Sequence, residues 1–184
     1  MEAHLQAADG DDSIQSLIEY KQVDAALLPK VRNLNSTLFP VHYSNSFYKG
    51  LLMPGQFCQL AFFNKTCVGT IACRRQPLGF ADNPKANLLL YRSVEPESME
   101  VYMMTLGVLG PYRRLGIGHG LLRNALRYAA RDANVARIVL HVQIDNEDAL
   151  RFYHKNGFRT VRMVEKYYRN IEPPHAYLLE YRLR

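Results

Sequence analysis

Two spacings of apolar residues divide this chain into expected helices and strands. Within Gly116–Ala133 the apolar side chains recur every three or four positions, at Ile117, Leu121, Leu122, Ala125, Leu126 and Ala129. This spacing places them on one stripe of a helix. Within Glu100–Val108, by contrast, Tyr102, Met104 and Leu106 alternate with other residues, as side chains on one face of a strand do.

Read along the whole chain, the same patterns predict an α/β fold. Helices are expected from Asp24 to Leu38, from Ser44 to Leu52, over Gly116–Ala133 and over Glu147–Lys155. Strands are expected at Ile14–Val23, Gln56–Phe63, Thr66–Arg74, Glu100–Val108, Arg137–Val142, Phe158–Val164 and Ala176–Leu183. This order predicts a mixed sheet that is covered by helices on both faces.

Two segments do not follow either spacing. Residues 1–16 are polar and contain an acidic cluster, so we expect a flexible N-terminal arm. Residues 76–98 contain three prolines and mixed charge, which predicts a long surface loop. The rest, residues 17–184, is expected to form one domain with a single core.

Composition places the chain among soluble globular proteins. Of its 184 residues, 48% are hydrophobic and 22% are charged. The longest apolar runs, Val101–Val108 and Ile138–Val142, are too short to cross a bilayer, and the N-terminus does not resemble a secretory signal. Three cysteines without paired spacing indicate a reducing compartment, and we expect Cys67 and Cys73 to be buried small hydrophobes.

The chain carries a formal charge of +6, which favours anionic partners. Arginines gather around one segment, at positions 113, 114, 123, 127, 131 and 137. A solvated helix face, a cofactor phosphate, a larger acidic partner and nucleic acid are all compatible with this cluster. Direct nucleic-acid readout is not expected, because the helix Gly116–Ala133 offers only Tyr128 for stacking.

A glycine-arginine turn, Arg113–Gly118, joins an expected strand to the strongest helix. Glycines let backbone amides approach a ligand closely, and free amides at a helix start favour an anion. The turn therefore predicts a diphosphate cradle, with a tight turn that merely needs glycine as the alternative. The spacing fits neither a nucleotide-triphosphate loop nor the dinucleotide fingerprint.

The turn belongs to a longer run, Tyr102–Gly118, that resembles GNAT acetyltransferases and, among them, the catalytic subunits of the N-terminal acetyltransferase E family. Similar segments occur in order at Phe39-Pro40-Val41-x-Tyr43, Leu140-His141-Val142-Gln143-Ile144, Asn146-Glu147, Phe152-Tyr153, Asn156-Gly157-Phe158 and Tyr167-Tyr168-x-x-Ile171-Glu172-Pro173. The resemblance runs from about Ile18 to the C-terminus. The arm before Ile18 and the long loop 76–98 depart from the family pattern.

The resemblance implies a GNAT fold of about seven strands and transfer of an acetyl group from acetyl-CoA, the co-substrate. It assigns proton handling to Tyr102 and His141, for which a packed strand aromatic and a satisfied core histidine are the structural alternatives. Contacts to acetyl-CoA are implied for Leu106, Gly107, Val108, Arg113, Arg114, Leu115, Gly116, Ile117, Gly118, His119, Asn146 and Tyr153. A bulge in Leu106–Val108 is implied as well, with the Leu106 N–H as oxyanion donor.

The resemblance further implies protein N-termini as acceptors, with methionine first and a hydrophobic residue second. Substrate contacts are implied for Phe39, Pro40, Val41, Tyr43, Met104, Tyr167, Tyr168 and Ile171. An auxiliary subunit shared with N-terminal acetyltransferase A is implied as partner. A cytoplasmic localisation is implied too, and nuclear or ribosome-associated localisation is left open. A lysine or small-amine acetyltransferase and a largely non-catalytic CoA-binding subunit are the rival hypotheses.

Overall fold

The computed structural model describes residues 14–82 and 98–184. Within these ranges, seven strands form one mixed sheet in the order β1-β2-β3-β4-β5-β7-β6, as predicted. The chain divides into two compact units. Unit 1 comprises Met1–Cys73 and Thr105–Ala125, and unit 2 comprises Arg74–Met104 and Leu126–Arg184. No helix in the described ranges is long and apolar enough to span a membrane.

Unit 1 begins with a correction to the predicted first strand. Ile14–Ser16 is helical, and β1 covers only Ile18–Gln22, where it pairs with β2 (Gln56–Phe63). The alternation of apolar residues before Ile18 is too short to hold a strand without a partner. The remainder of the arm, residues 1–13, lies outside the described residues.

The helices of unit 1 lie within their predicted ranges, but the predicted start of the first helix at Asp24 is wrong. The Asp24 carboxylate accepts from the Leu27 N–H at 3.0 Å, in the turn before the helix. α2 (Leu28–Leu38) has Pro29 in its first turn and buries Val31 and Leu34, and it ends before Phe39-Pro40 as predicted. α3 (Asn45–Gly50) is capped by Ser44, whose hydroxyl accepts from the Phe47 N–H at 3.3 Å. The hairpin turn Asn64-Lys65 has positive φ at both residues and leads into β3 (Thr66–Pro77).

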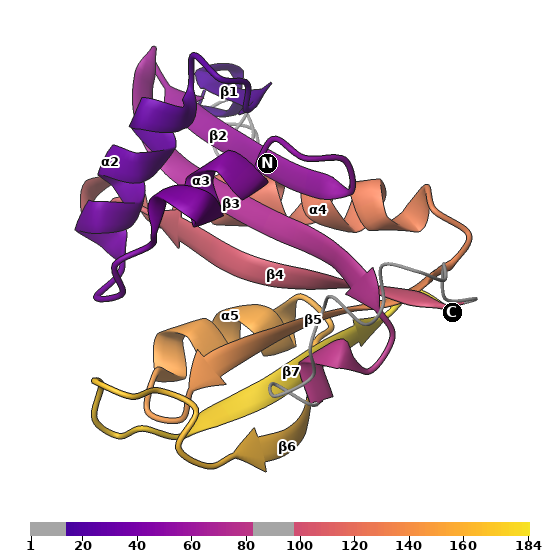
Figure 1. Cartoon of the computed structure of the whole chain (residues 1–184). Helices are drawn as coiled ribbons and strands as arrows, with labels where there is room; N and C mark the ends of the chain where they lie inside the picture. The colour runs from indigo at the N-terminus through magenta and orange to yellow at the C-terminus, as the bar shows by residue number, and fades with distance from the viewer. Residues whose placement is uncertain (1–13, 83–97) are drawn as a thin grey trace, which may run out of the picture. The chain divides into compact units, whose positions relative to one another are not determined.

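Two glycines show which helix covers which face of unit 1 (Figure 1). A Cβ on Gly69 of β3 would point at Leu121 of α4 (Ile117–Ala130), at 3.3 Å. A Cβ on Gly107 of β4 (Met99–Val108) would instead point at Leu38 of α2, at 2.9 Å. The sheet of unit 1 is therefore enclosed on both faces, and its interior is mostly apolar, with Asn35, Thr70 and Thr105 as buried polar residues.

Unit 2 is built on β5 (Val135–Gln143), which pairs in parallel with β4 and antiparallel with β7 (Ala176–Arg182). β6 (Arg159–Val164) pairs with the other side of β7. α5 (Glu147–Lys155) follows β5 and lies beside it in Figure 1. It ends at Lys155, and Gly157, with a φ of 86°, follows the C-cap residue Asn156 and terminates the helix as predicted.

The expected long loop after β3 begins later than predicted. β3 continues to Pro77, and a short 3₁₀ helix, η1 (Phe80–Asp82), follows it. Residues 83–97, which make up most of the predicted loop, lie outside the described residues.

Candidate active site

The pairing of β4 with β5 brings Tyr102 and His141 together. Tyr102 lies opposite Val139 in this register, and His141 is two residues further along β5. The Tyr102 hydroxyl lies 3.1 Å from His141 Nδ1, within hydrogen-bond distance. The fold thus brings together two side chains that are 39 positions apart in sequence and that the resemblance had paired, while their catalytic roles stay predictions.

A third aromatic residue joins this pair. The hydroxyl of Tyr167, from the loop between β6 and β7, lies 2.8 Å from that of Tyr102. Its ring stacks on the imidazole of His141, with centroids 4.1 Å apart and planes 16° from parallel. The sequence resemblance assigned Tyr167 only to the substrate wall. No spacing rule connects it to Tyr102, so only the resemblance to relatives could have signalled this contact.

Burial sets the charge of the three side chains. It raises the pKa of Tyr102 well above its usual 10, and it raises the pKa of Tyr167 as well. Burial, the largest cause, and the Arg162 charge together lower the pKa of His141 to about 4, against an opposing effect of the Asp82 charge. All three groups are therefore neutral at pH 7.

His141 Nε2 is buried and has no hydrogen-bond partner among the described residues. A buried ring nitrogen in that state carries a desolvation cost unless a ligand or an ordered water pairs with it. Because Nδ1 is engaged by Tyr102, Nε2 is the nitrogen that remains to accept a proton from a substrate. A proton-accepting role of Nε2 stays a prediction.

The glycine-arginine turn of unit 1 has the backbone of an anion cradle. Arg114 and Gly116 both have positive φ, 66° and 78°, and α4 begins at Ile117. Arg114 is the less common residue here, because side chains other than glycine adopt this conformation in only a few per cent of cases. The first amides of α4 have no carbonyl partner within the helix and lie at the positive end of its dipole.

Neighbouring side chains hold this turn in place. The Arg113 Nε donates to the Val108 carbonyl at 3.1 Å, which links the end of β4 to the turn. Tyr20 of β1 donates to the Ile117 carbonyl at 3.4 Å. Gln15 donates to the Leu115 carbonyl at 3.4 Å, a contact that sequence reasoning missed because it expected a strand there. The residues present fit a diphosphate, with amides, a helix start and two exposed arginines at one turn.

The strand before the turn is compatible with the predicted splay. Parallel pairing of β4 with β5 ends at Tyr102, before the expected bulge at Leu106–Val108. Gly107 has a second role that the sequence did not show, because Leu38 and Phe39 pack within 3.0 Å of where its Cβ would be. The bulge and the Leu106 oxyanion donor stay predictions.

Two residues expected to touch CoA have structural roles as well. Asn146 caps α5, where its side-chain oxygen accepts from the Ala149 N–H at 3.1 Å. Tyr153 is buried, and its hydroxyl lies 3.5 Å from the sulfur of Met103. These observations confirm the predicted cap, and contacts of either residue with CoA stay predictions.

The loops assigned to the substrate contain both packed aromatic residues and exposed residues. In unit 1, Tyr43 stacks on Phe47 at a centroid distance of 4.4 Å and meets Phe39 edge-on, while Pro40 and Val41 are exposed. In unit 2, Tyr168 meets Tyr167 edge-on at 4.9 Å, and its N–H donates to the Pro174 carbonyl. Met104 and Ile171 are half-buried. Their contacts with a substrate stay predictions.

The cysteines do not form a reactive site. All three thiols are free. Cys73 is buried as predicted, while Cys67 is only half-buried. Burial raises the pKa of Cys58 to about 12 and also raises that of Cys73, so neither forms a thiolate near neutrality. The described residues contain no cluster of three His, Cys, Asp or Glu side chains arranged for a metal ion.

Comparison with known proteins agrees with the geometry. The family model described as "Acetyltransferase (GNAT) family" matches residues 28–158. N-alpha-acetyltransferase 50 of Danio rerio is 38% identical over 91% of this chain and 89% of the relative. "Probable N-acetyltransferase san" of Drosophila melanogaster is also 38% identical, over 92% of this chain and 83% of its own length.

Solved structures show the same fold. Arabidopsis thaliana Naa50 in complex with the bisubstrate analogue CoA-Ac-MVNAL matches with a TM-score of 0.76 and 38% identity. The match covers 90% of this chain and 98% of that one. Arabidopsis thaliana NAA60 in complex with acetyl-CoA matches with a TM-score of 0.75 at 22% identity, which supports the fold alone.

Proposed function

The chain belongs to the acetyltransferase (GNAT) family, and we propose that it is an N-α-acetyltransferase of protein N-termini. It transfers the acetyl group of acetyl-CoA to a free α-amino group. The observation that carries the proposal is the buried Nε2 of His141, which has no hydrogen-bond partner in residues 14–82 and 98–184, on an imidazole that contacts Tyr102 and Tyr167. The two relatives that are 38% identical over most of the chain support the same activity.

The acceptor amine enters the reaction uncharged. A free α-amino group has a pKa of about 7.7–8.0, so a useful fraction is neutral at cellular pH. His141, with a pKa of about 4, is too weak a base to deprotonate the free ammonium ion. It takes the proton later, when the new C–N bond has made the nitrogen strongly acidic.

In the proposed step, the amine nitrogen bonds to the thioester carbon, and the C–S bond breaks. His141 Nε2 accepts the proton of the nitrogen and returns it to the departing sulfur. We assign Nδ1–H as donor to the Tyr102 oxygen, which leaves the lone pair of Nε2 for the proton. Tyr102, kept neutral by burial, donates in turn to Tyr167 and orients the imidazole.

Acetyl-CoA supplies an activated acyl group and an anionic diphosphate by which it can be held. We assign the diphosphate to the amides of Gly116, Ile117 and Gly118, with Arg113 and Arg114 as adjacent cations. The Leu106 N–H is assigned to the oxyanion, where a single donor typically contributes about a hundredfold or more in rate.

For the acceptor we propose methionine first, followed by a hydrophobic residue. In unit 2 the half-buried Met104 suits contact with an apolar side chain. The analogue bound to Arabidopsis thaliana Naa50, CoA-Ac-MVNAL, carries a peptide with this pattern. Association with an auxiliary subunit of the N-terminal acetyltransferase A complex, in the cytoplasm, is part of the proposal and rests on the sequence resemblance.

The test is a steady-state assay with acetyl-CoA and a peptide that begins Met-Leu. Tyr102→Phe and His141→Ala should each lower kcat at least about tenfold, the scale that general acid–base groups contribute. The control is His154→Ala, which removes an exposed histidine that hydrogen-bonds Thr160, and it should leave kcat unchanged. Unchanged turnover in both site variants would overturn the assignment, and no turnover by the wild type would favour a CoA-binding subunit.

A further inference from the structure

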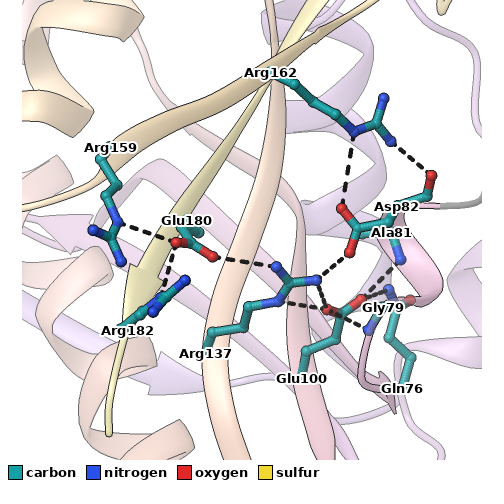
Figure 2. A network of polar contacts seen from close by, with 10 residues as sticks. All are labelled: Gln76, Gly79, Ala81, Asp82, Glu100, Arg137, Arg159, Arg162, Glu180 and Arg182. Atoms are coloured by element: carbon teal, nitrogen blue, oxygen red, sulfur yellow. Dashed lines mark hydrogen bonds and ion pairs between the residues drawn. The ribbon is translucent and has the colours of Figure 1, made fainter.

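A fully buried carboxylate lies two residues before Tyr102 on β4. Glu100 is 0% exposed, and the network around it is drawn in Figure 2. Its two oxygens accept from the Gln76 side chain at 2.8 Å, the Gly79 N–H at 3.1 Å, the Ala81 N–H at 2.8 Å and the Arg137 Nε at 2.9 Å. A site with so many donors is built for a charged carboxylate.

Arg137 is the cation that compensates Glu100. The parallel register places the two residues side by side on β4 and β5. The same guanidinium reaches Asp82 at 2.5 Å and Glu180 at 3.2 Å, and Glu180 also accepts from Arg159 and Arg182. Arg137 therefore forms ion pairs with carboxylates of the chain itself, although the sequence analysis had grouped it with arginines that favour an anionic partner.

One route from Glu100 leads to the ring of Tyr102. Gln76, held by Glu100, accepts from the Arg74 Nε and Nη2 at 3.1 and 2.8 Å. This contact aims the Arg74 guanidinium, whose carbon lies 5.7 Å from the centre of the Tyr102 ring. A cation at this distance attracts the face of the ring.

A second route runs through the turn Gly79–Asp82. Glu100 holds this turn by the N–H groups of Gly79 and Ala81. Ala81 is buried in a cluster with Val139, Val164 and Leu178, and Tyr102 and Tyr167 pack against that cluster. The turn thus forms part of the support for both tyrosines.

The end of the same turn carries a charge that acts on His141. Asp82 pairs with Arg137 and with Arg162, whose Nη2 also donates to the Asp82 carbonyl at 2.6 Å. The Asp82 charge raises the pKa of His141, against the larger lowering by burial and the lowering by Arg162. The other titratable groups against the imidazole are Tyr102 and Tyr167, both neutral.

We propose that Glu100, with Arg137, is a positioning residue of the catalytic centre, because it holds the two supports against which Tyr102 and Tyr167 lie. The inference rests on the proposed acetyl transfer and adds residues that do not touch the reacting atoms. A buried ion pair is a costly way to gain stability alone, whereas its several hydrogen bonds fix one geometry. A shift of about 1 Å in reacting groups can cost a hundredfold in rate.

The test compares Glu100→Gln with two neighbouring arginine variants. Glu100→Gln keeps the size of the side chain but replaces one oxygen by an NH₂ group and removes the charge. The Gly79–Asp82 turn therefore loses one of its two N–H hydrogen bonds to this side chain. It should lower kcat about tenfold or more, with the KM for acetyl-CoA within about twofold of the wild type. Arg74→Met should lower kcat about three- to tenfold. The matched control, Arg75→Met, removes a guanidinium paired with Asp132 instead and should change kcat less than twofold.

A kcat of Glu100→Gln within twofold of the wild type would overturn the proposal, as would equal losses in Arg74→Met and Arg75→Met. If Glu100→Gln does not fold, the comparison of Arg74→Met with Arg75→Met tests the proposal on its own.

A second readout does not need turnover: NMR titration of His141 should give a lower pKa in Asp82→Asn than in the wild type, and an unchanged one in Arg75→Met. Absence of wild-type activity on any peptide would contradict the proposed function. An equal His141 pKa in Asp82→Asn and in the wild type would instead contradict the support role of the turn.

Discussion

The two nitrogens of the His141 imidazole lie in different surroundings. Nδ1 is within 3.1 Å of the Tyr102 hydroxyl, while Nε2 is buried without a partner among the described residues. The ring is also stacked against Tyr167. Such a histidine keeps one orientation and one tautomer, and it stays neutral through the physiological range because burial lowers its pKa to about 4.

The first prediction concerns the pH dependence of the rate. His141 works in its neutral form, which is lost only as the pH falls through its folded pKa of about 4. The acid limb of kcat should therefore lie well below the ordinary histidine value of about 6.5. In kcat/KM, a separate limb near pH 7.7–8.0 should follow the substrate amine. Over pH 5 to 9, stopped assays should show the amine limb in kcat/KM and no histidine limb in kcat, and a kcat limb near 6.5 would contradict the description of His141.

At this scale the sequence predicted the central pair but not its surroundings. Tyr102 and His141 were found because each sits in a motif that resembles a known family. The contact of Tyr167 with both was not predicted, because it depends on a loop that returns 65 residues later in the chain. The ties of Arg137 to Glu100, Asp82 and Glu180 were missed for the same reason, since ion-pair partners leave no spacing in the sequence.

Among the elements, the turn before α4 is the part that geometry constrains most. It combines a left-handed arginine and a left-handed glycine within three residues. Gln15 and Tyr20 donate to the carbonyls of Leu115 and Ile117, and these hydrogen bonds help to hold the turn in its conformation. The turn is therefore preformed for an anion and pays little ordering entropy on binding.

Gly116→Ala tests this turn. The φ of 78° costs an alanine about 1–2 kcal/mol, and the new Cβ would meet the Gln15 side chain at 2.9 Å. We expect the Kd for acetyl-CoA, measured by calorimetry, to rise about tenfold. Gly50→Ala is the matched control, because no atom lies within 4 Å of its Cβ position, and its Kd should match the wild type. An equal Kd in both variants would argue against a CoA cradle at this turn.

The two capped helices allow cap and ligand roles to be separated. Asn146→Ala removes the cap of α5 and Ser44→Ala that of α3, and each loss should lower the free energy of unfolding by about 1 kcal/mol. If Asn146 also contacts CoA, only Asn146→Ala should raise the KM for acetyl-CoA, by about threefold or more. Urea unfolding and steady-state kinetics measure the two effects. An unchanged KM would leave Asn146 as a cap alone.

Helices and strands were predicted most reliably where caps and periodicity agreed. α5 runs over Glu147–Lys155 as expected from Asn146 and Gly157. The prediction failed for Ile14–Ser16, where a helical turn places Gln15 on the Leu115 carbonyl. Short segments of this kind follow their tertiary contacts rather than their own propensity.

Several of the positive charges of this basic chain are paired with carboxylates in the folded structure. The formal charge is +6, yet unit 2 gathers four arginines around Glu180, Asp82 and the buried Glu100. These ion pairs act in the folded state and depend on ionised carboxylates. The net surplus left over suits an anionic co-substrate without requiring a nucleic-acid partner.

Stability should fall in acid, and His141 should account for part of the loss. Its pKa is about 4 in the folded chain against about 6.5 unfolded, so the unfolded chain binds more protons between these values. The free energy of unfolding should therefore fall as the pH drops from 6.5 to 4, by about 3 kcal/mol from this residue. Below 4.5, the lowered pKa of Glu180 adds a further loss. Urea titrations of wild type and His141→Gln check this, and identical pH slopes would contradict it.

The position of the transferred acetyl group tests the central claim most directly. A peptide that begins Met-Leu and contains one internal lysine is incubated with the protein and acetyl-CoA, and tandem mass spectrometry locates the added acetyl group. We predict acetylation of the α-amino group only, and no product from the same peptide with a blocked N-terminus. Acetyl groups on the lysine of the blocked peptide would contradict the account.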